Sequence, residues 1–193
     1  KKKFVQQLDA VDKDAIEKFV SGIESGEILP SIKSEDVPES QPNDVLTVVA
    51  KSLKDELFKS DRDMLLKVYA PWCGHCKTIA PHFDEAAGLL KSLDLSSKVA
   101  LGKLDGTLND STVDGLEWSG FPTLVYVKAG TEEIVTYDGP RTKEGILAWI
   151  GSNSDQEDLK VLTEEYVTAE FEKKDTAGED DPDDEEEGDK EEL

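Results

Sequence analysis

Two cysteines stand three positions apart, as Cys73-Gly74-His75-Cys76, and they are the only cysteines in the chain. A disulfide between them closes so short a loop that it stabilises the fold by only about 2 kcal/mol, before any strain is subtracted. The pair is therefore of little use as a structural cross-link. It is better suited to chemistry in which the two sulfurs alternate between a dithiol and a disulfide.

The residues around the cysteine pair predict a strand before it and a helix after it. Residues 64–70 are mostly apolar, and residues 76–93 have helical periodicity, with a kink expected at Pro81. Cys73 then lies at a helix N-terminus, where free N–H groups and the helix dipole stabilise a thiolate. We therefore expect Cys73 to be the attacking thiolate and the more deeply buried Cys76 to be the resolving thiol.

A zinc site is the alternative interpretation of the same residues. A closed zinc site needs four ligands, and the chain offers only the two cysteines, His75 and His82. His75 lies between the cysteines, a poor position from which to join them on one ion, so we expect no metal site. Beside the sulfurs, His75 is instead expected to add a positive charge or a hydrogen-bond donor, and His82 is expected on a helix surface.

Residues 44–151 have the pattern of one α/β domain. The predicted order of elements is βαβαβαββα, which describes helices packed on both sides of a mixed sheet. Asn109 is a candidate helix cap, the last two strands form a hairpin turning at Ala129-Gly130, and Gly151 should follow the last helix. The further strands are expected at 45–49, 98–105, 123–127 and 133–137, and the further helices at 52–59, 109–116 and 142–150.

The segments before this domain have a different character. Residues 1–30 predict one amphipathic helix, after a possible short strand at 4–8, which is too little structure to bury a core. We expect them to be the remnant of another domain, and residues 31–43, with two prolines, to be a linker. No signal peptide is expected at the N-terminus. The apolar stripe of the helix consists of Ile16, Phe19, Val20 and Ile23.

The charge of the chain excludes several classes of function. The formal net charge is −22, and residues 155–193 alone hold 19 acidic residues against 4 basic ones. We therefore expect an acidic tail over residues 152–193 that is disordered after Lys174. Its apolar residues Leu159, Leu162, Tyr166 and Val167 predict one weak helical stripe before that point. Nucleic-acid binding is excluded because phosphate contacts need clustered basic residues, and anionic membrane surfaces are disfavoured for the same reason. The longest apolar run, residues 121–127, is too short for membrane insertion.

The segment from Tyr69 to Lys77, YAPWCGHCK, resembles the active-site signature of a catalytic domain of the protein disulfide isomerase family. The resemblance covers nearly the whole chain and implies a thioredoxin-like fold, a central mixed β-sheet flanked by helices. Residues 1–43 resemble the end of a redox-inactive b′ domain and the linker that follows it. Further matches are Pro81, Lys103, residues 120–123 (GFPT), residues 138–142 (DGPRT) and the C-terminal Lys190-Glu191-Glu192-Leu193, a variant of the endoplasmic reticulum retrieval signal.

The resemblance also implies roles for individual residues. Pro122 would follow a cis peptide bond and present the backbone of Phe121 to an extended substrate, although an isolated proline is more often trans. Arg141 would swing toward Cys76 and lower the pKa of that thiol, unless it is only a surface charge. The implied catalytic residues are Cys73, Gly74, His75, Cys76, Lys103 and Arg141, and the implied substrate-binding residues are Trp72, Gly120, Phe121 and Pro122.

One position departs from the family pattern. A buried carboxylate usually lies six residues before the first cysteine and accepts the proton of the resolving thiol, but this chain has Lys67 there. With Lys103 on the next strand, two lysines converge on one interior. Burying both as cations is costly, so at least one is expected to be neutral, to reach outward or to find an unforeseen carboxylate.

We therefore predict thiol–disulfide exchange on substrate proteins in the lumen of the endoplasmic reticulum, through a mixed disulfide at Cys73 that Cys76 resolves. No metal or organic cofactor is expected, and glutathione or an oxidase would be the electron partner. Expected partners are unfolded or disulfide-bearing proteins, a retrieval receptor for residues 190–193, and Ca²⁺ bound weakly by the acidic tail. The alternatives are a chaperone-like or Ca²⁺-buffering binding module with secondary redox activity, and a thioredoxin-type reductase.

Overall fold

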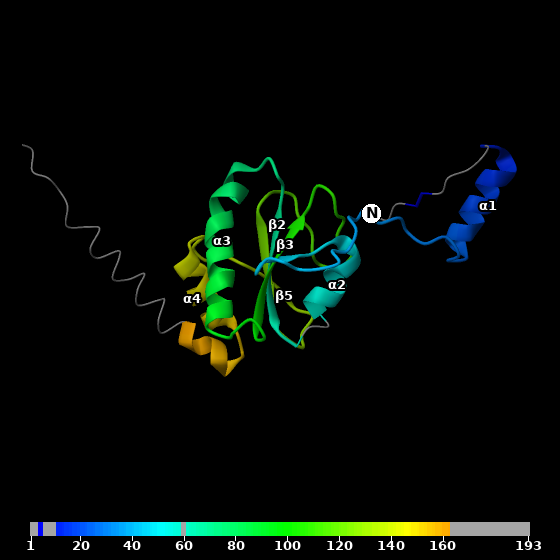
Figure 1. Cartoon of the computed structure of the whole chain (residues 1–193). Coiled ribbons are helices and arrows are strands. Elements are labelled where there is room, and N and C mark those ends of the chain that lie inside the picture. Colours follow the sequence, from blue (N-terminus) through cyan, green and yellow to red (C-terminus); the bar gives the residue numbers. More distant parts are fainter. Residues whose placement is uncertain (1–3, 6–10, 59–60, 163–193) are drawn as a thin grey trace, which may run out of the picture. The chain divides into compact units, whose positions relative to one another are not determined.

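The computed structural model of the protein describes residues 4–5, 11–58 and 61–162 (Figure 1). The chain divides into two compact units, residues 1–138 and residues 139–193. The strand expected at 4–8 falls mostly outside the described residues, as does the acidic tail beyond residue 162. None of the helices described is both long enough and apolar enough to cross a membrane.

A five-stranded mixed sheet forms the centre of the first unit and confirms the predicted fold class. Strands β1, β3 and β2 run parallel to one another, β4 pairs antiparallel with β2, and β5 pairs antiparallel with β4. The first strand is shorter than expected. The strands, in their order across the sheet, are β1 (Leu46–Thr47), β3 (Val99–Asp105), β2 (Asp63–Tyr69), β4 (Thr123–Val127) and β5 (Ile134–Thr136).

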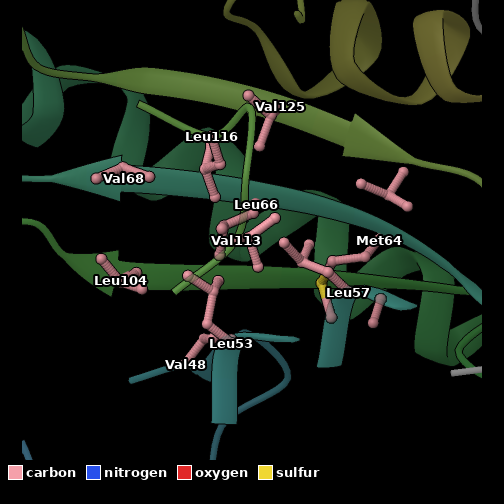
Figure 2. Packing of buried hydrophobic residues seen from close by; sticks show 12 residues of the cluster. Val48, Leu53, Leu57, Met64, Leu66, Val68, Leu104, Val113, Leu116 and Val125 are labelled. Carbon is pink, nitrogen blue, oxygen red and sulfur yellow. The ribbon is translucent and has the colours of Figure 1, made fainter. Parts of the chain in front are cut away.

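The two faces of the central strand β2 meet two different helices. Met64, Leu66 and Val68 point to one face and pack in a buried apolar cluster with residues of helix α2 (Ala50–Phe58), as Figure 2 shows. Because side chains alternate along a strand, Lys67 points to the other face. There its Nζ lies 4.5 Å from the centre of the Phe83 ring on helix α3 (Gly74–Ser92). Helices α2 and α3 therefore cover opposite faces of the sheet (Figure 1).

The helix predicted at residues 109–116 does not form, and turns and loops occupy that range. The side chain of Asn109 is buried and bonds to residues of other segments instead of capping a helix at 109–116. Its amide oxygen accepts from the N–H groups of Ala50 (3.0 Å) and Glu35 (3.1 Å). Its amide nitrogen donates to the Asp105 carbonyl (3.0 Å) and to the Glu35 carboxylate (2.8 Å). Because Ala50 begins α2, Asn109 supplies an acceptor to the N-terminus of that distant helix and does not begin a helix of its own.

The residues predicted to form a linker are hydrogen-bonded to the sheet domain. Lys33 N–H donates to the Asp110 carboxylate and the Asp110 N–H donates to the Lys33 carbonyl, both at 2.8 Å. The amide side chain of Gln41 pairs with the backbone of Thr47 through two bonds of 2.9 Å. Residues 33–41 are thus attached along one side of the first unit.

Helix α1 (Lys13–Glu24) is present as predicted. The Asp12 carboxylate caps its N-terminus by accepting from Ala15 N–H at 2.8 Å. Two residues of its apolar stripe, Ile16 and Val20, are exposed. The helix therefore presents apolar side chains that the described residues leave uncovered.

The second unit holds helix α4 (Lys143–Asn153), whose N-cap Thr142 accepts from Gly145 N–H at 3.1 Å. Gly151 was expected to follow the last helix, and that prediction is wrong, because Gly151 lies buried inside α4. Its φ is not positive, so it has no helix-ending conformation. Residues 157–162 are helical as well, and Leu159 and Leu162 there are fully buried.

Candidate active site

Cys73 is the N-cap residue of α3, and its sulfur takes part in the cap. The Cys76 N–H donates to Cys73 Sγ at 3.2 Å, so the sulfur occupies the place of a capping oxygen. Both cysteines are free thiols, with 7% of Cys73 and 4% of Cys76 exposed. The helix terminus therefore directs an N–H group at the first sulfur, an arrangement that stabilises negative charge there.

The loop before β4 lies against the first sulfur. The Cys73 thiol donates to the Phe121 carbonyl at 3.4 Å. The Phe121–Pro122 peptide bond is cis, which confirms the prediction made for this bond. Trp72, with 72% of its surface exposed, meets the Phe121 ring edge-on at 5.9 Å between centroids. The exposed tryptophan and the Cys73 sulfur thus both contact Phe121, the residue before the cis bond.

Gly106, which sequence reasoning missed, makes room for this loop. A Cβ on Gly106 would lie 2.7 Å from Phe121 Cε1, 2.7 Å from Trp118 Nε1 and 2.8 Å from Val68 Cγ1. The Trp118 indole also donates to the Gly106 carbonyl at 3.3 Å. Only glycine permits so close an approach. The sequence feature that could have identified this position is a glycine directly after a predicted strand, at residues 98–105.

Behind the second sulfur lies a cavity of about 180 Å³ between α3 and the sheet. Cys76 lines it from α3, and Lys67 and Lys103 line it from β2 and β3. These lysines are register partners on neighbouring parallel strands, so both point to the same face. Lys67 is only 4% exposed. The remaining lining residues are Tyr69, Ala70, Pro71, Lys77, Ala80 and Asp84.

Burial and neighbouring charges shift three pKa values around this cavity. Burial lowers the pKa of Lys67, with Lys103 adding to the effect, while Asp84 and Cys76 act in the opposite direction. Burial raises the pKa of Cys76, as does its hydrogen bond with Cys73, whereas Lys67 lowers it. Burial also raises the pKa of Tyr69. Lys67 and the Cys76 sulfur therefore each favour the charged form of the other.

The other predicted site residues lie in different surroundings. Gly74 and His75 are exposed in the first turn of α3, and a Cβ on Gly74 would meet nothing within 4 Å. Gly120 is exposed, and its carbonyl accepts from the Thr123 hydroxyl at 2.9 Å. Arg141 is exposed and belongs to the second unit, directly before the cap of α4.

Asp84 is a further residue that the sequence did not single out. It follows Cys76 by eight positions, two turns of a helix, which places both on one helix face. Ala80 lies between them on the same face and lines the same cavity. The sequence shows that Cys76, Ala80 and Asp84 are spaced four residues apart. It does not show that this face of α3 is the one that meets Lys67 and Lys103.

The amino-acid sequence of the chain is similar to those of a known family and of several known proteins. The thioredoxin family model matches residues 44–152. Protein disulfide-isomerase of Aspergillus niger is 43% identical over 82% of this chain and 31% of its own length. Protein disulfide isomerase-like 1-1 of Arabidopsis thaliana is 40% identical over 75% of this chain and 28% of its own. The chain thus spans less than a third of the length of these curated relatives.

Among solved structures, the first thioredoxin domain of mouse protein disulfide-isomerase A4 is 33% identical, with a TM-score of 0.48. That likeness covers 59% of this chain and 78% of the mouse domain. The family match takes in more than half of the chain and contains the sheet, α3 and the cysteine pair. The chain belongs to the thioredoxin family, and its thioredoxin domain is similar to those of protein disulfide-isomerases.

Proposed function

We propose that this chain catalyses thiol–disulfide exchange in protein substrates, with the activity of a protein disulfide-isomerase. The observation that carries the proposal is the placement of Cys73, whose sulfur caps α3 and contacts the Phe121 carbonyl before a cis proline. The similarity to protein disulfide-isomerases over most of the chain supports it.

The reaction begins at Cys73. Its thiolate attacks one sulfur of a substrate disulfide, forms a mixed disulfide and releases the other substrate sulfur as a thiolate. The thiolate of Cys76 then attacks Cys73 Sγ, so the Cys73–Cys76 disulfide forms and the substrate leaves fully reduced. The reverse sequence donates a disulfide to a substrate dithiol. When the released substrate thiolate attacks elsewhere in its own chain, the net result is isomerisation.

The location, electron partner and substrates proposed for this reaction are based on the similarity to protein disulfide-isomerases and on the sequence of residues 190–193. The lumen of the endoplasmic reticulum is the proposed location, since an oxidising compartment maintains such disulfides. The sequence of residues 190–193, which lie outside the described residues, is consistent with retrieval by a receptor. Glutathione or an oxidase is the proposed electron partner, and unfolded or disulfide-bearing proteins are the proposed substrates. Weak binding of Ca²⁺ by the acidic residues remains a further proposal.

Single-cysteine variants test the order of attack. Cys73→Ser should abolish turnover of a scrambled disulfide substrate, because the sulfur at the helix terminus is the one that attacks. Cys76→Ser should accumulate mixed disulfides, visible as slower bands on non-reducing gels that reductant removes. His82→Gln, at a half-buried position of α3 six residues after Cys76, serves as the control that keeps both cysteines. Equal trapping by the two cysteine variants would contradict the assignment.

A further inference from the structure

Lys67 is a buried cation without a carboxylate at ion-pair distance in the described part of the chain. Its Nζ lies over the face of the Phe83 ring, 4.5 Å from the ring centre. An aromatic face stabilises a cation only in part, by about 2 kcal/mol when water is excluded. Burying an ammonium group costs more than this, so a second source of negative charge is expected near it.

The cavity of about 180 Å³ holds two groups that can supply it, the Asp84 carboxylate and the Cys76 sulfur. Cys76 lines it together with Lys67, and its thiol becomes an anion when it loses its proton. Ala80 and Asp84 follow Cys76 on the same helix face, and the small alanine leaves the space open between them. Asp84 is exposed, whereas Cys76 and Lys67 are both 4% exposed. The buried end of the cavity therefore contains the lysine and the sulfur, and its acidic residue lies toward the surface.

Positive charge predominates in this cavity while Cys76 is a thiol. Lysines face it from β2, α3 and β3, against one carboxylate from α3 and the neutral phenol of Tyr69. Ionisation of Cys76 reduces this excess, so the field of the cavity favours the thiolate. The titratable groups facing Lys67 are Tyr69 on its own strand, Cys76, Lys77 and Asp84 on α3, and Lys103 on β3.

We infer that Lys67 is a fixed counter-ion for the Cys76 thiolate and so sets the rate at which the resolving cysteine attacks. The inference rests on the proposed function, since it concerns the second step of the exchange. Lys67 acts through Cys76 and is therefore a positioning residue. The effects of the two groups on each other support this assignment, because Cys76 raises the pKa of Lys67 and Lys67 lowers the pKa of Cys76, in each case against the larger effect of burial.

The step that Lys67 assists is balanced within the protein and its substrate. Cys76 loses its proton to water in the cavity, and the thiolate stays beside the ammonium group of Lys67. Its electron pair forms the bond to Cys73 Sγ, while the bond between Cys73 and the substrate sulfur breaks. The substrate sulfur leaves with that electron pair and takes a proton from solvent. The cysteine pair is oxidised by two electrons and the substrate disulfide is reduced by two.

The two steps separate when the reduced full chain is mixed rapidly with dithiobis(nitrobenzoate). Attack by Cys73 releases one coloured thiolate at a rate proportional to reagent concentration. Attack by Cys76 on the mixed disulfide releases the second at a rate that is independent of it. Lys67→Met should slow the second phase about tenfold at pH 7 and leave the first unchanged. The second-phase rates of the variant and the wild type should become equal at high pH, where Cys76 ionises in both proteins.

Two variants distinguish a charge effect from a packing effect. Lys67→Arg keeps a positive charge that cannot be lost, so it should restore the second phase to within about threefold of wild type. Asp84→Asn, at an exposed position where folding is not at risk, should speed the second phase about twofold because it removes a competing negative charge. Lys54→Met, on α2 at the opposite face of the sheet, is the matched control and should change neither phase.

The inference is overturned if Lys67→Met gives the pH profile of Lys54→Met, or if Lys67→Arg is as slow as Lys67→Met. A slower second phase in Asp84→Asn would overturn it as well. A wild-type chain that releases no coloured thiolate in either phase would instead contradict the proposed function, because Cys73 would not then be a competent nucleophile.

Discussion

Gly106 follows directly after β3 and lies against Phe121, in the loop that carries the cis Phe121–Pro122 bond. In Gly106→Ala, the new methyl group would meet Phe121, Trp118 and Val68 at 2.7–2.8 Å, and Val68 belongs to the packed core. We expect the free energy of unfolding to fall by about 1–3 kcal/mol, the usual cost of overpacking. Urea unfolding at constant m-value is the measurement.

Gly120→Ala is the matched control for this substitution. Its Cβ would meet nothing within 4 Å and its φ is not positive, so the unfolding free energy should stay within about 0.5 kcal/mol. The two variants add the same methyl group, in one case against the Phe121 ring and in the other at the residue that precedes Phe121 in the chain. Equal losses in both would show that close packing at Gly106 is not the reason for its glycine.

Single residues also show where sequence reasoning reaches its limit. The cysteine pair and the cis bond before Pro122 could be predicted because their signals are local and belong to a short motif. Asn109 was misread as a helix cap, since its partners Ala50 and Glu35 lie 59 and 74 residues away in the chain. A side chain that bonds distant backbones has no local signature.

At the scale of elements, periodicity predicted most helices and strands within a few residues. β2 and β3 could be recognised as buried strands, and α3 as a long helix that runs through Pro81. The cavity between them could not be predicted, because it depends on the register that pairs Lys67 with Lys103. The sequence did indicate that two lysines converge on one interior, and the structure adds Asp84 as the carboxylate on their cavity.

Lys67 is buried between β2 and α3, and its burial lowers the free energy of unfolding by an amount that depends on pH. Burial lowers the pKa of Lys67 from its ordinary value of 10.5, so near that pH the unfolded chain binds more protons than the folded chain. Stability arising from this group therefore rises with pH through a window just below 10.5. The cost is complete at pH values below the lowered pKa of Lys67 in the folded chain, and above 10.5 it is gone.

Lys67→Met should therefore be more stable than wild type at pH 7, by about 1–2 kcal/mol, and the gain should shrink as the pH approaches 10.5. Thermal unfolding of the two proteins across this range checks the prediction. Cys76 and Tyr69 have raised pKa values, which make stability fall with pH in both proteins. Loss of Lys67 raises the Cys76 pKa further, so this effect also makes the gain of the variant shrink as the pH rises. A gain that stayed constant with pH would show that lost charge is not its cause.

At the scale of the whole molecule, the composition shows clearly where the acidic region begins. It does not show where the folded region ends. Residues 155–193 are so acidic that the apolar residues among them are hard to interpret. Leu159 and Leu162 are nevertheless fully buried, and Ser154 is buried with them in the second unit. Two leucines three positions apart are too few to define a period, and the expected partners Tyr166 and Val167 lie outside the described residues.

The burial of these leucines predicts that residues beyond 151 contribute to the stability of the chain. Leu159→Ala and Leu162→Ala should each lower the free energy of unfolding by about 2–5 kcal/mol, because each removes a fully buried side chain. Val161→Ala is the matched control, since Val161 lies in the same helical segment with its side chain exposed, and it should cost less than about 0.5 kcal/mol.

Ending the chain at residue 151 should have a larger effect than either leucine substitution. The cut removes both buried leucines, and burial of each stabilises the fold by about 1.5–3 kcal/mol. Together they amount to a large part of the 5–15 kcal/mol that is typical for a domain. We therefore expect the shortened chain to unfold at a clearly lower urea concentration than the full chain. If its midpoint matched that of the full chain, residue 151 would be the true end of the folded region, and the burial of Leu159 and Leu162 would have no energetic weight.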